Sequence, residues 1–284
     1  MVYDCLIIGA GPAGITASLY IARANLNTMV LYQGKSALEK TNLIQNYYGF
    51  SDGISGKQLY ETGIKQAQNL GVEVKTEEAT KIQISQNGFK VITPKSEYEA
   101  KTIILATGNS KNKPKIIGIE EFEGKGVSYC AICDGFFYRN KEVCVIGSGN
   151  YAISEVNELL AIAKKITILT NGEKKPEFRA DNVAIETKEI KEITGKDKVE
   201  EIQFKNGTSL KTDGIFIAQG VAGSLDFAKK LGIVTSQNKI IVNENMETNV
   251  KGIYACGDCT RTDCYKFQKQ FMKELLQECK QFNL

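Results

Sequence analysis

A glycine-rich turn that occurs twice constrains the fold of this chain more than any other feature. The apolar run Cys5–Ile8 leads into Gly9-Ala-Gly-Pro-Ala-Gly14, a helical pattern follows to Asn25, and a second apolar run covers Thr28–Tyr32. Short β-rich runs bounded by glycine are typical of strands, and a 3.6-residue apolar period between them is typical of a crossover helix. The segment therefore predicts a βαβ unit.

The same unit recurs at a constant offset of 138 residues (147 minus 9) without a gap. The second copy consists of the strand pattern Val143–Ile146, the turn Gly147-Ser-Gly-Asn-Tyr-Ala152, a helix to Lys164 and the strand pattern Ile166–Leu169. A complete second copy favours two dinucleotide-type units over one motif and a coincidental pair of glycines. We therefore predict an α/β fold with two Rossmann-like, three-layer dinucleotide-binding-type domains.

Turn-rich clusters predict where the two domains join. Asn109–Pro114 and Ser236–Lys239 are polar segments of the kind that separates periodic elements. We expect a middle domain, 113–239, inserted into an outer domain made of 1–112 and 240–284. Further strand patterns occupy Phe89–Ile92, Thr102–Leu105 and Gly214–Ile217.

The composition of the 284 residues excludes several classes of protein. With 42% hydrophobic and 24% charged residues, the chain resembles a soluble globular protein. A net charge of +3 without a basic cluster argues against nucleic-acid binding. The uncharged stretch from Cys5 to Ala22 is broken by glycine and proline, so we predict neither a signal peptide nor a membrane span. Eight cysteines in such a chain predict a cytoplasmic protein with mostly reduced thiols.

Histidine is absent, and only four of the 36 basic residues are arginine. The chain therefore has no imidazole for a Ser-His-Asp triad, a Cys-His pair, a His-ligated metal or a His general base. Bidentate phosphate contacts are also scarce, because arginine supplies that planar geometry and lysine does not. Genomic base composition is an equally good explanation of the excess of lysine.

The first turn predicts a nucleotide site. Gly9 permits the tight turn, Gly11 lets the backbone approach a pyrophosphate, and Gly14 lets the helix pack closely on the strand. The pyrophosphate is then expected at the helix N-terminus, among free N–H groups. Tyr32 and Gln33 stand where an acidic residue would bind a ribose hydroxyl, so we expect a different contact there.

Cys130-Ala-Ile-Cys133 is the most specific chemical motif. Two cysteines separated by two residues can close a small redox disulfide, and nearby dipoles can lower one thiol pKa. Asp134 follows directly and can move a proton, a task for which no histidine is present. The alternatives are two buried thiols or half of a zinc site, for which Cys256 and Cys259 form the one other pair of this spacing. We favour the redox disulfide and predict no metal.

With these motifs the sequence resembles the low-molecular-weight, flavin-dependent thioredoxin reductase family over nearly the whole chain. The residues that carry the resemblance are Gly9–Gly14, Asn46-Tyr-Tyr-Gly-Phe50, Gly53-Ile-Ser-Gly56, Ala106-Thr-Gly108, Cys130–Phe137 and Ala255-Cys-Gly-Asp258. The resemblance implies a tightly bound FAD, with its pyrophosphate on the first glycine turn, Pro12 and Ala13 included. It also implies thioredoxin as a partner and a homodimeric protein.

The resemblance assigns roles to single residues. Asn46 is expected near the isoalloxazine, and Asp258 near the ribityl and phosphate groups. Cys133 is expected to face the flavin, Cys130 to exchange with the thioredoxin disulfide, and Asp134 to act as acid and base. The remaining expected cofactor contacts are Tyr32, Gln33, Ala106, Thr107, Gly108 and Gly257.

Three departures from the family pattern concern the second glycine unit. The segment Thr170–Phe178 lacks the His-Arg-Arg-Asp stretch that grips the 2′-phosphate of NADPH, and offers Lys174 and Lys175 as point charges. Tyr151 replaces a small residue of the turn, and Gln219–Ser224 replaces a Gly-His-x-Pro-Asn segment. We therefore predict that NADPH is not used. The flavin domain also departs from the pattern, at Ser36–Thr41 and Tyr265–Phe267.

A CxxC and a flavin without an NADPH site match the ferredoxin-dependent flavin thioredoxin reductases, which the sequence resembles. The implied path of electrons runs from reduced ferredoxin, in single-electron steps, through FAD to the Cys130–Cys133 disulfide and then to thioredoxin. One alternative is an NADPH-dependent reductase that holds the 2′-phosphate with Lys174, Lys175 or Arg179. Another is a non-catalytic redox sensor.

The other cysteines allow weaker predictions. Cys5 and Cys144 lie in strand patterns and are expected to be buried as small hydrophobic residues. Cys256, Cys259 and Cys264 flank the Gly-Asp motif, where a second redox pair is an alternative. Cys279, on an expected C-terminal helix, has no assigned role.

Overall fold

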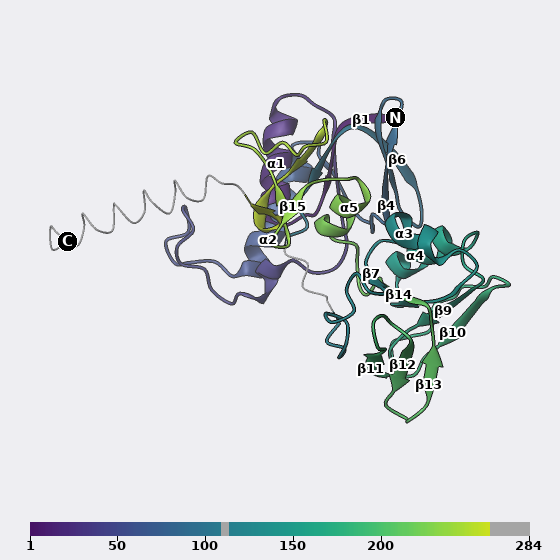
Figure 1. Cartoon of the computed structure of the whole chain (residues 1–284). Helices are drawn as coiled ribbons and strands as arrows, with labels where there is room; N and C mark the ends of the chain where they lie inside the picture. Colours follow the sequence, from purple (N-terminus) through teal and green to yellow (C-terminus); the bar gives the residue numbers. More distant parts are fainter. Residues whose placement is uncertain (109–113, 262–284) are drawn as a thin grey trace, which may run out of the picture.

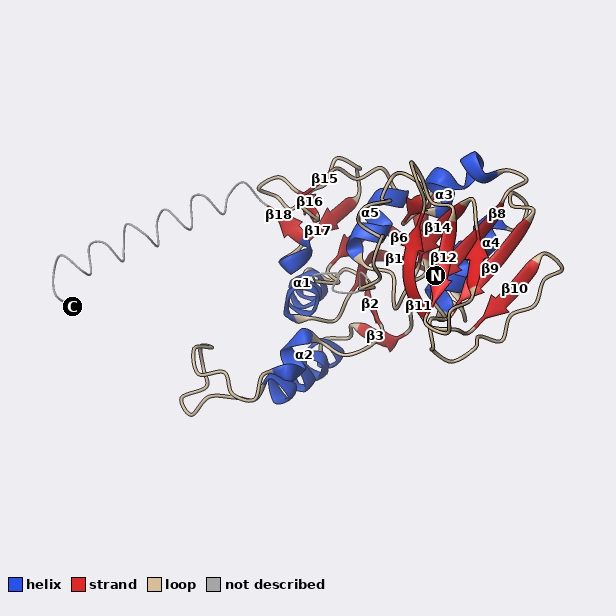
Figure 2. Ribbon diagram, turned by 60° about the horizontal axis from the view of Figure 1, so that its bottom comes forward, coloured by secondary structure: helices blue, strands red, loops and turns tan. Residues whose placement is uncertain are grey.

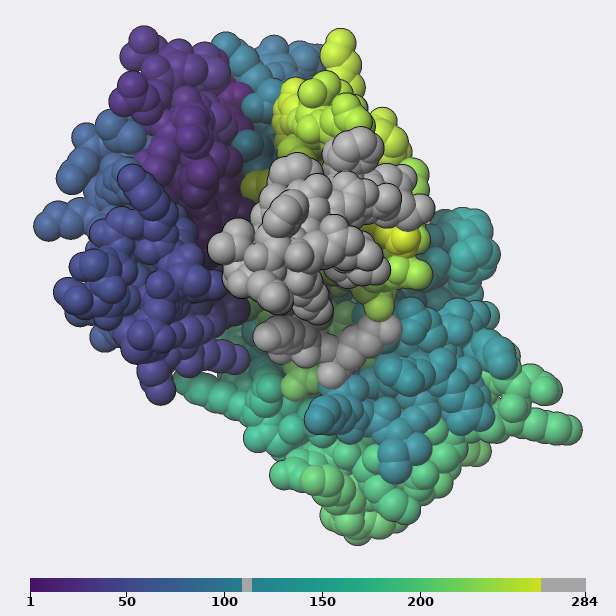
Figure 3. All heavy atoms as spheres, turned by 90° about the vertical axis from the view of Figure 1, so that its left-hand side faces the viewer, coloured from purple at the N-terminus to yellow at the C-terminus, as the bar shows by residue number. Residues whose placement is uncertain are grey.

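The computed structural model describes residues 1–108 and 114–261, which form two lobes (Figure 1). In the space-filling view of Figure 3, the teal and green second lobe lies below the purple and blue residues of the first. The elements of the first half are β1 (Val2–Ile8), α1 (Pro12–Arg23), β2 (Thr28–Tyr32), the 3₁₀ helix η1 (Ala37–Lys40), α2 (Gly56–Asn69), β3 (Glu73–Thr76), β4 (Lys81–Ser85), β5 (Gly88–Ile92), β6 (Glu97–Leu105), β7 (Val127–Ser128), α3 (Ala131–Asp134) and η2 (Gly135–Tyr138). Those of the second half are β8 (Glu142–Ile146), α4 (Asn150–Leu159), β9 (Lys165–Leu169), β10 (Val183–Glu186), β11 (Ile190–Thr194), β12 (Glu201–Phe204), β13 (Ser209–Lys211), β14 (Gly214–Ile217), α5 (Ser224–Lys230), β15 (Thr235–Ser236), β16 (Lys239–Ile241), β17 (Ile253–Ala255), η3 (Gly257–Cys259) and β18 (Thr260–Arg261).

The first lobe is built on a seven-stranded sheet in the order β3-β2-β1-β6-β5-β4. β1, β2 and β3 are parallel, as the crossover through α1 requires, while β4, β5 and β6 form an antiparallel meander. β17 returns from far along the chain and pairs in parallel with the end of β6, where Ile253 lies opposite Ile103. β17 follows the strands of the second sheet in the sequence, and it completes the sheet of the first lobe.

Alternation of side chains along β1 gives the first sheet two buried faces. Ile7 shares an apolar cluster with Ile15 of α1 and Ala67 of α2, so these two helices cover one face. Leu6 and Ile8 point to the opposite face and join the largest apolar cluster of the described residues. That cluster continues into α4, so the two lobes share part of one core.

The second lobe repeats this design with a five-stranded parallel sheet in the order β10-β9-β8-β14-β7 (Figure 2). Val156 and Leu159 of α4 bury one face, and Ile193 and Ile202 of the β11-β12-β13 meander belong to the cluster on the other. The predicted fold class, with two Rossmann-like units and the second inserted into the first, is confirmed. The exact domain boundaries stay a prediction.

Two expectations about elements differ from the structure. Helix α4 ends at Leu159 and does not run to Lys164, because the Asn182 side-chain amide donates to the carbonyl oxygens of Leu160 and Ala163 (both 3.1 Å) and holds them out of the helix. The polar cluster Ser236–Lys239 is a turn, but it joins β15 to β16, with Gln237 and Asn238 both at positive φ. It connects two strands of one hairpin. The first expected linker lies almost wholly outside the described residues.

Within residues 1–108 and 114–261, no helix is long and apolar enough to cross a membrane.

Candidate functional site

The first glycine turn is shaped by close approach of backbone to backbone. Gly9 has φ +115°, and a Cβ there would lie 2.4 Å from the carbonyl oxygen of Ala106. A Cβ on Gly14 would lie 2.0 Å from the carbonyl oxygen of Gly9. A Cβ on Gly11, by contrast, would meet nothing within 4 Å. The turn therefore packs tightly on β6 and leaves open space over Gly11, where the backbone can meet a bound group.

Other expected cofactor residues converge on this turn. α1 begins after Gly11 with no side-chain cap, and a free helix N-terminus attracts an anion. A Cβ on Gly257 would lie 2.7 Å from the Cβ of Ala13, so η3 lies beside the start of α1. β6 ends at Leu105, which places Ala106, Thr107 and Gly108 at the same edge. The site fits a pyrophosphate.

Three other expected contacts, Tyr32, Gln33 and Asn46, lie on segments outside this turn. Gln33 is exposed just after β2, whereas Tyr32 is half-buried with its ring edge-on to Tyr60. Asn46 is exposed on the segment that precedes α2, which projects from the lobe (Figure 2). The binding roles of these residues stay predictions.

A disulfide joins Cys130 to Cys133 at the start of α3. Cys130 is the N-cap residue, and its sulfur accepts a hydrogen bond from the backbone N–H of Cys133 (3.2 Å). In this arrangement Cys130 is 3% exposed, whereas Cys133 lies at the surface. The Sγ of Cys133 lies 3.8 Å from the carbonyl oxygen of Lys229 in α5.

Ser128 connects Asp134 to the disulfide, a link that sequence reasoning missed. The Ser128 hydroxyl donates to Oδ2 of Asp134 (2.6 Å) and accepts from the backbone N–H of Cys130 (3.1 Å). It is buried, so this hydrogen bond is shielded from water. A hydroxyl residue two positions before the first cysteine was the available signal.

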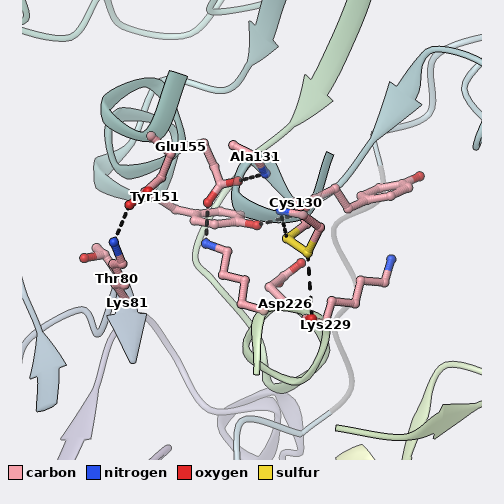
Figure 4. Close-up of polar contacts among 12 residues, drawn as sticks. Thr80, Lys81, Cys130, Ala131, Tyr151, Glu155, Asp226 and Lys229 are labelled. Carbon is pink, nitrogen blue, oxygen red and sulfur yellow. Dashed lines mark hydrogen bonds and ion pairs between the residues drawn. A yellow bond between two sulfur atoms is a disulfide. The ribbon is translucent and has the colours of Figure 1, made fainter. Parts of the chain in front are cut away.

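A buried ion pair lies behind the disulfide, and it too was missed (Figure 4). Oε2 of Glu155 in α4 accepts a hydrogen bond from the backbone N–H of Ala131 (2.8 Å), and the same carboxylate pairs with Lys230 of α5. Lys230 Nζ also lies 5.0 Å from the ring centre of Tyr151. Burial raises the pKa of Tyr151 well above its usual range, and the nearby Asp226 carboxylate adds a smaller increase. A glutamate among the apolar positions of the predicted helix was the signal for this pair.

The other described cysteines are reduced in this structure. Cys5 and Cys144 are buried in strands, which confirms that prediction. Cys256 is half-buried and Cys259 buried, and burial raises the pKa of both thiols. Cys264, Cys279 and Tyr265–Phe267 lie outside the described residues.

The sequence profile of the pyridine nucleotide-disulphide oxidoreductases matches residues 3–277. The thioredoxin reductase of Listeria innocua is 36% identical over 278 residues, which cover 90% of this chain and 86% of that protein. The protein belongs to the thioredoxin reductase family. It is thus an oxidoreductase of the low-molecular-weight, FAD-binding type, with a redox-active CxxC disulfide.

Solved structures of this family resemble most of the chain. The atypical thioredoxin reductase TRi of Desulfovibrio vulgaris Hildenborough is 35% identical, with a TM-score of 0.85, over 92% of this chain and 90% of that one. A ferredoxin-flavin thioredoxin reductase of Clostridium acetobutylicum is 34% identical, with a TM-score of 0.66, over 91% and 89%. The family and the disulfide chemistry follow from these likenesses, and the electron donor is a separate question.

Proposed function

We propose that this member of the family reduces thioredoxin with electrons from reduced ferredoxin and does not use NADPH. The choice of donor rests on the position of Tyr151. Its side chain, in place of a small residue of the second glycine turn, is 2% exposed and packs in the core that the two lobes share. No arginine pair follows β9, where a 2′-phosphate would be held. The ferredoxin-flavin thioredoxin reductase of C. acetobutylicum, which is named for this donor, is a relative of this chain.

We assign the FAD to the first lobe. Gly9, Gly11 and Gly14 shape the turn, Pro12 and Ala13 begin the helix that would face the pyrophosphate, and Gly257 and Asp258 border it. The resemblance adds Tyr32, Gln33, Asn46, Ala106, Thr107 and Gly108 to this set. FAD, when bound, accepts single electrons and passes on electron pairs, which suits a one-electron donor and a disulfide acceptor.

The reduced pair Cys130 and Cys133 would reduce thioredoxin by thiol–disulfide exchange. The Cys130 thiolate attacks one sulfur of the thioredoxin disulfide, which releases one thiolate and leaves a mixed disulfide. Cys133 then attacks Cys130, the second thioredoxin thiolate leaves, and Cys130–Cys133 is oxidised again. The two thioredoxin thiolates take up two protons, and Asp134, held by Ser128, is placed to deliver one.

The burial of Cys130 bears on this exchange. At 3% exposure the Cys130 side chain does not face a partner protein, so the exchange requires a movement that exposes its sulfur. The surface beside Cys133 is apolar, with Ile132, Phe136 and Phe137 all exposed. Such a patch is suited to a protein partner. A second copy of the chain, as in the homodimers of the family, stays a prediction.

One observation favours the NADPH-dependent alternative. Lys174, Lys175 and Arg179 are exposed, and the last two line a groove of about 430 Å³ beside β10. Lysine ammonium groups can hold a phosphate as point charges. The experiment below therefore includes this donor.

The test mixes the FAD-loaded protein with excess NADPH without oxygen, and in parallel with photoreduced ferredoxin and thioredoxin. We expect the flavin absorbance to persist with NADPH, and thioredoxin thiols to accumulate with ferredoxin. Rapid bleaching by NADPH would overturn the proposal. If neither donor leads to reduced thioredoxin, the redox-sensor alternative is the better account.

A further inference from the structure

The two glycine turns of this chain share a sequence pattern, but their surroundings differ. Over the first turn, a Cβ on Gly11 would meet nothing within 4 Å. Over the second, a Cβ on the equivalent Gly149 would lie 3.3 Å from the carbonyl oxygen of Gly220, which follows β14. β8 and β14 are neighbours at the point where the strand order of the second sheet reverses, which is where such sheets bind nucleotides. A side chain at Gly149 would thus have less room than one at Gly11.

A carboxylate from the first lobe lies at the N-terminus of α4. Glu78, in the connection from β3 to β4, accepts a hydrogen bond from the Asn150 side-chain amide (3.0 Å). Glu78 is 7% exposed, and its second oxygen, Oε1, is buried without a hydrogen-bond partner. The N–H groups of the first turn of such a helix normally receive a pyrophosphate. In this chain, the Glu78 carboxylate lies at that N-terminus, where the side chain of Asn150 binds it.

A second carboxylate lies on the other side of the turn. The Ser148 hydroxyl, between the two glycines, donates to Oε2 of Glu173, and the Gln219 side-chain amide donates to Oε1 (3.2 Å). Glu173 follows β9, Ser148 follows β8 and Gln219 follows β14. The Glu173 carboxylate therefore binds residues that follow β8 and β14, the two strands between which the strand order of the sheet reverses. An acidic residue after the second strand of such a unit excludes a 2′-phosphate by charge repulsion.

Because Gly149 and Asn150 remain exposed, these carboxylates act by charge more than by filling the crevice. We infer that Glu78 and Glu173 place negative charge beside the second glycine turn, where Glu78 repels the pyrophosphate of a pyridine dinucleotide and Glu173 repels the 2′-phosphate of NADPH, and that they thereby exclude these cofactors from it. They are specificity-determining residues for the electron donor. The inference deepens the proposed function and rests on it, since the exclusion matters to the reaction only when electrons enter by another route.

The test measures nucleotide binding, with no electron transfer. The FAD-loaded, full-length protein is titrated calorimetrically with NADP⁺ and with NAD⁺, as the unaltered chain and as Glu173→Gln, Glu78→Gln and the double variant. Glu177→Gln is the matched control, because it removes the same charge from the same exposed segment. We expect no binding by the unaltered chain or by the control below about 1 mM, and about tenfold tighter NADP⁺ binding for each carboxylate removed.

Binding of either dinucleotide by the unaltered chain below about 1 mM, or no gain in Glu173→Gln, would overturn the inference. An equal gain in NADP⁺ affinity in Glu177→Gln would also overturn it, because the gain would then result from the change in net charge and not from the position of the carboxylate. Glu173 is exposed and outside the core, so that variant decides the question if Glu78→Gln does not fold. Failure of ferredoxin to reduce the protein would count against the proposed function alone, because these titrations contain no donor.

Discussion

Burial sets the chemistry of the thiols outside the disulfide. Desolvation raises the pKa of Cys5 to about 11, and the pKa of Cys144 and Cys256 to about 12. At pH 8 a thiol with a pKa of 12 is about one part in ten thousand thiolate, and the thiolate is the reactive form. Among the cysteines of residues 1–108 and 114–261, we expect iodoacetamide at pH 8 to label Cys133 first in the reduced, folded protein, and Cys5, Cys144 and Cys256 only after denaturation, as read by peptide mass spectrometry. Their labelling should rise only as the pH approaches 11 to 12.

The same measurement separates the two interpretations of Cys256 and Cys259. Denatured protein is the control, since it removes the differences in burial. If Cys256 reacts in the folded protein as fast as Cys133, the pair beside the Gly-Asp motif is redox-active and the conclusion from burial is wrong.

At the scale of elements, two glycines of the first strand–turn–helix unit differ in their roles. We expect Gly9 to be required for folding and Gly11 to be required for binding. Gly9 has φ +115° and no room for a Cβ, so Gly9→Ala must move the end of β6 and should cost about 2 kcal/mol or more of unfolding free energy. Gly11 has φ −68° and open space, so Gly11→Ala should change stability without FAD by no more than about 1 kcal/mol. We expect Gly11→Ala to weaken FAD binding instead, because the methyl group enters the space that the cofactor needs.

Urea unfolding of the FAD-free proteins and titration with FAD test this pair of variants. Each variant is the control for the other, because both add one methyl group to the same turn. Equal losses of stability would show that the open space over Gly11 is not a feature of the folded protein.

At the scale of the whole molecule, a buried ion pair ties α4 to α5. Glu155 of α4 and Lys230 of α5 are 1% and 4% exposed at their side chains, and Glu155 also holds the N-terminus of α3. Removing one partner of a buried pair leaves an uncompensated charge and costs about 3–5 kcal/mol. We expect Lys230→Met to lower the unfolding free energy by about this amount, and Glu155→Gln in the same chain to restore most of it.

Urea unfolding of the FAD-loaded protein measures both variants. Lys81→Met is the control, since Lys81 also pairs with a glutamate of α4, Glu158, but at a more exposed position. A loss in Lys230→Met no larger than in Lys81→Met, or no recovery in the double variant, would show that the buried pair does not stabilise the fold.

The sequence by itself determined the local elements and the kind of chemistry. Glycine spacing and apolar periodicity predicted both βαβ units because these signals arise within a few turns of chain, and β2 and β14 have the expected bounds. The CxxC motif predicted the disulfide for the same reason, since its two cysteines are close in any compact turn. The end of α4 was missed because the Asn182 side chain that stops the helix comes from a distant segment.

Only the tertiary structure decided which groups far apart in the sequence meet. Ser128 beside Asp134 lies within one short segment, but Glu155 with Lys230 and Glu78 with Asn150 join residues 75 and 72 positions apart. No local pattern encodes such a pair, because its energy depends on how the two lobes pack and on the water excluded between them. The two glycine turns also have similar sequences. Only their surroundings in space leave one open and put carboxylates against the other.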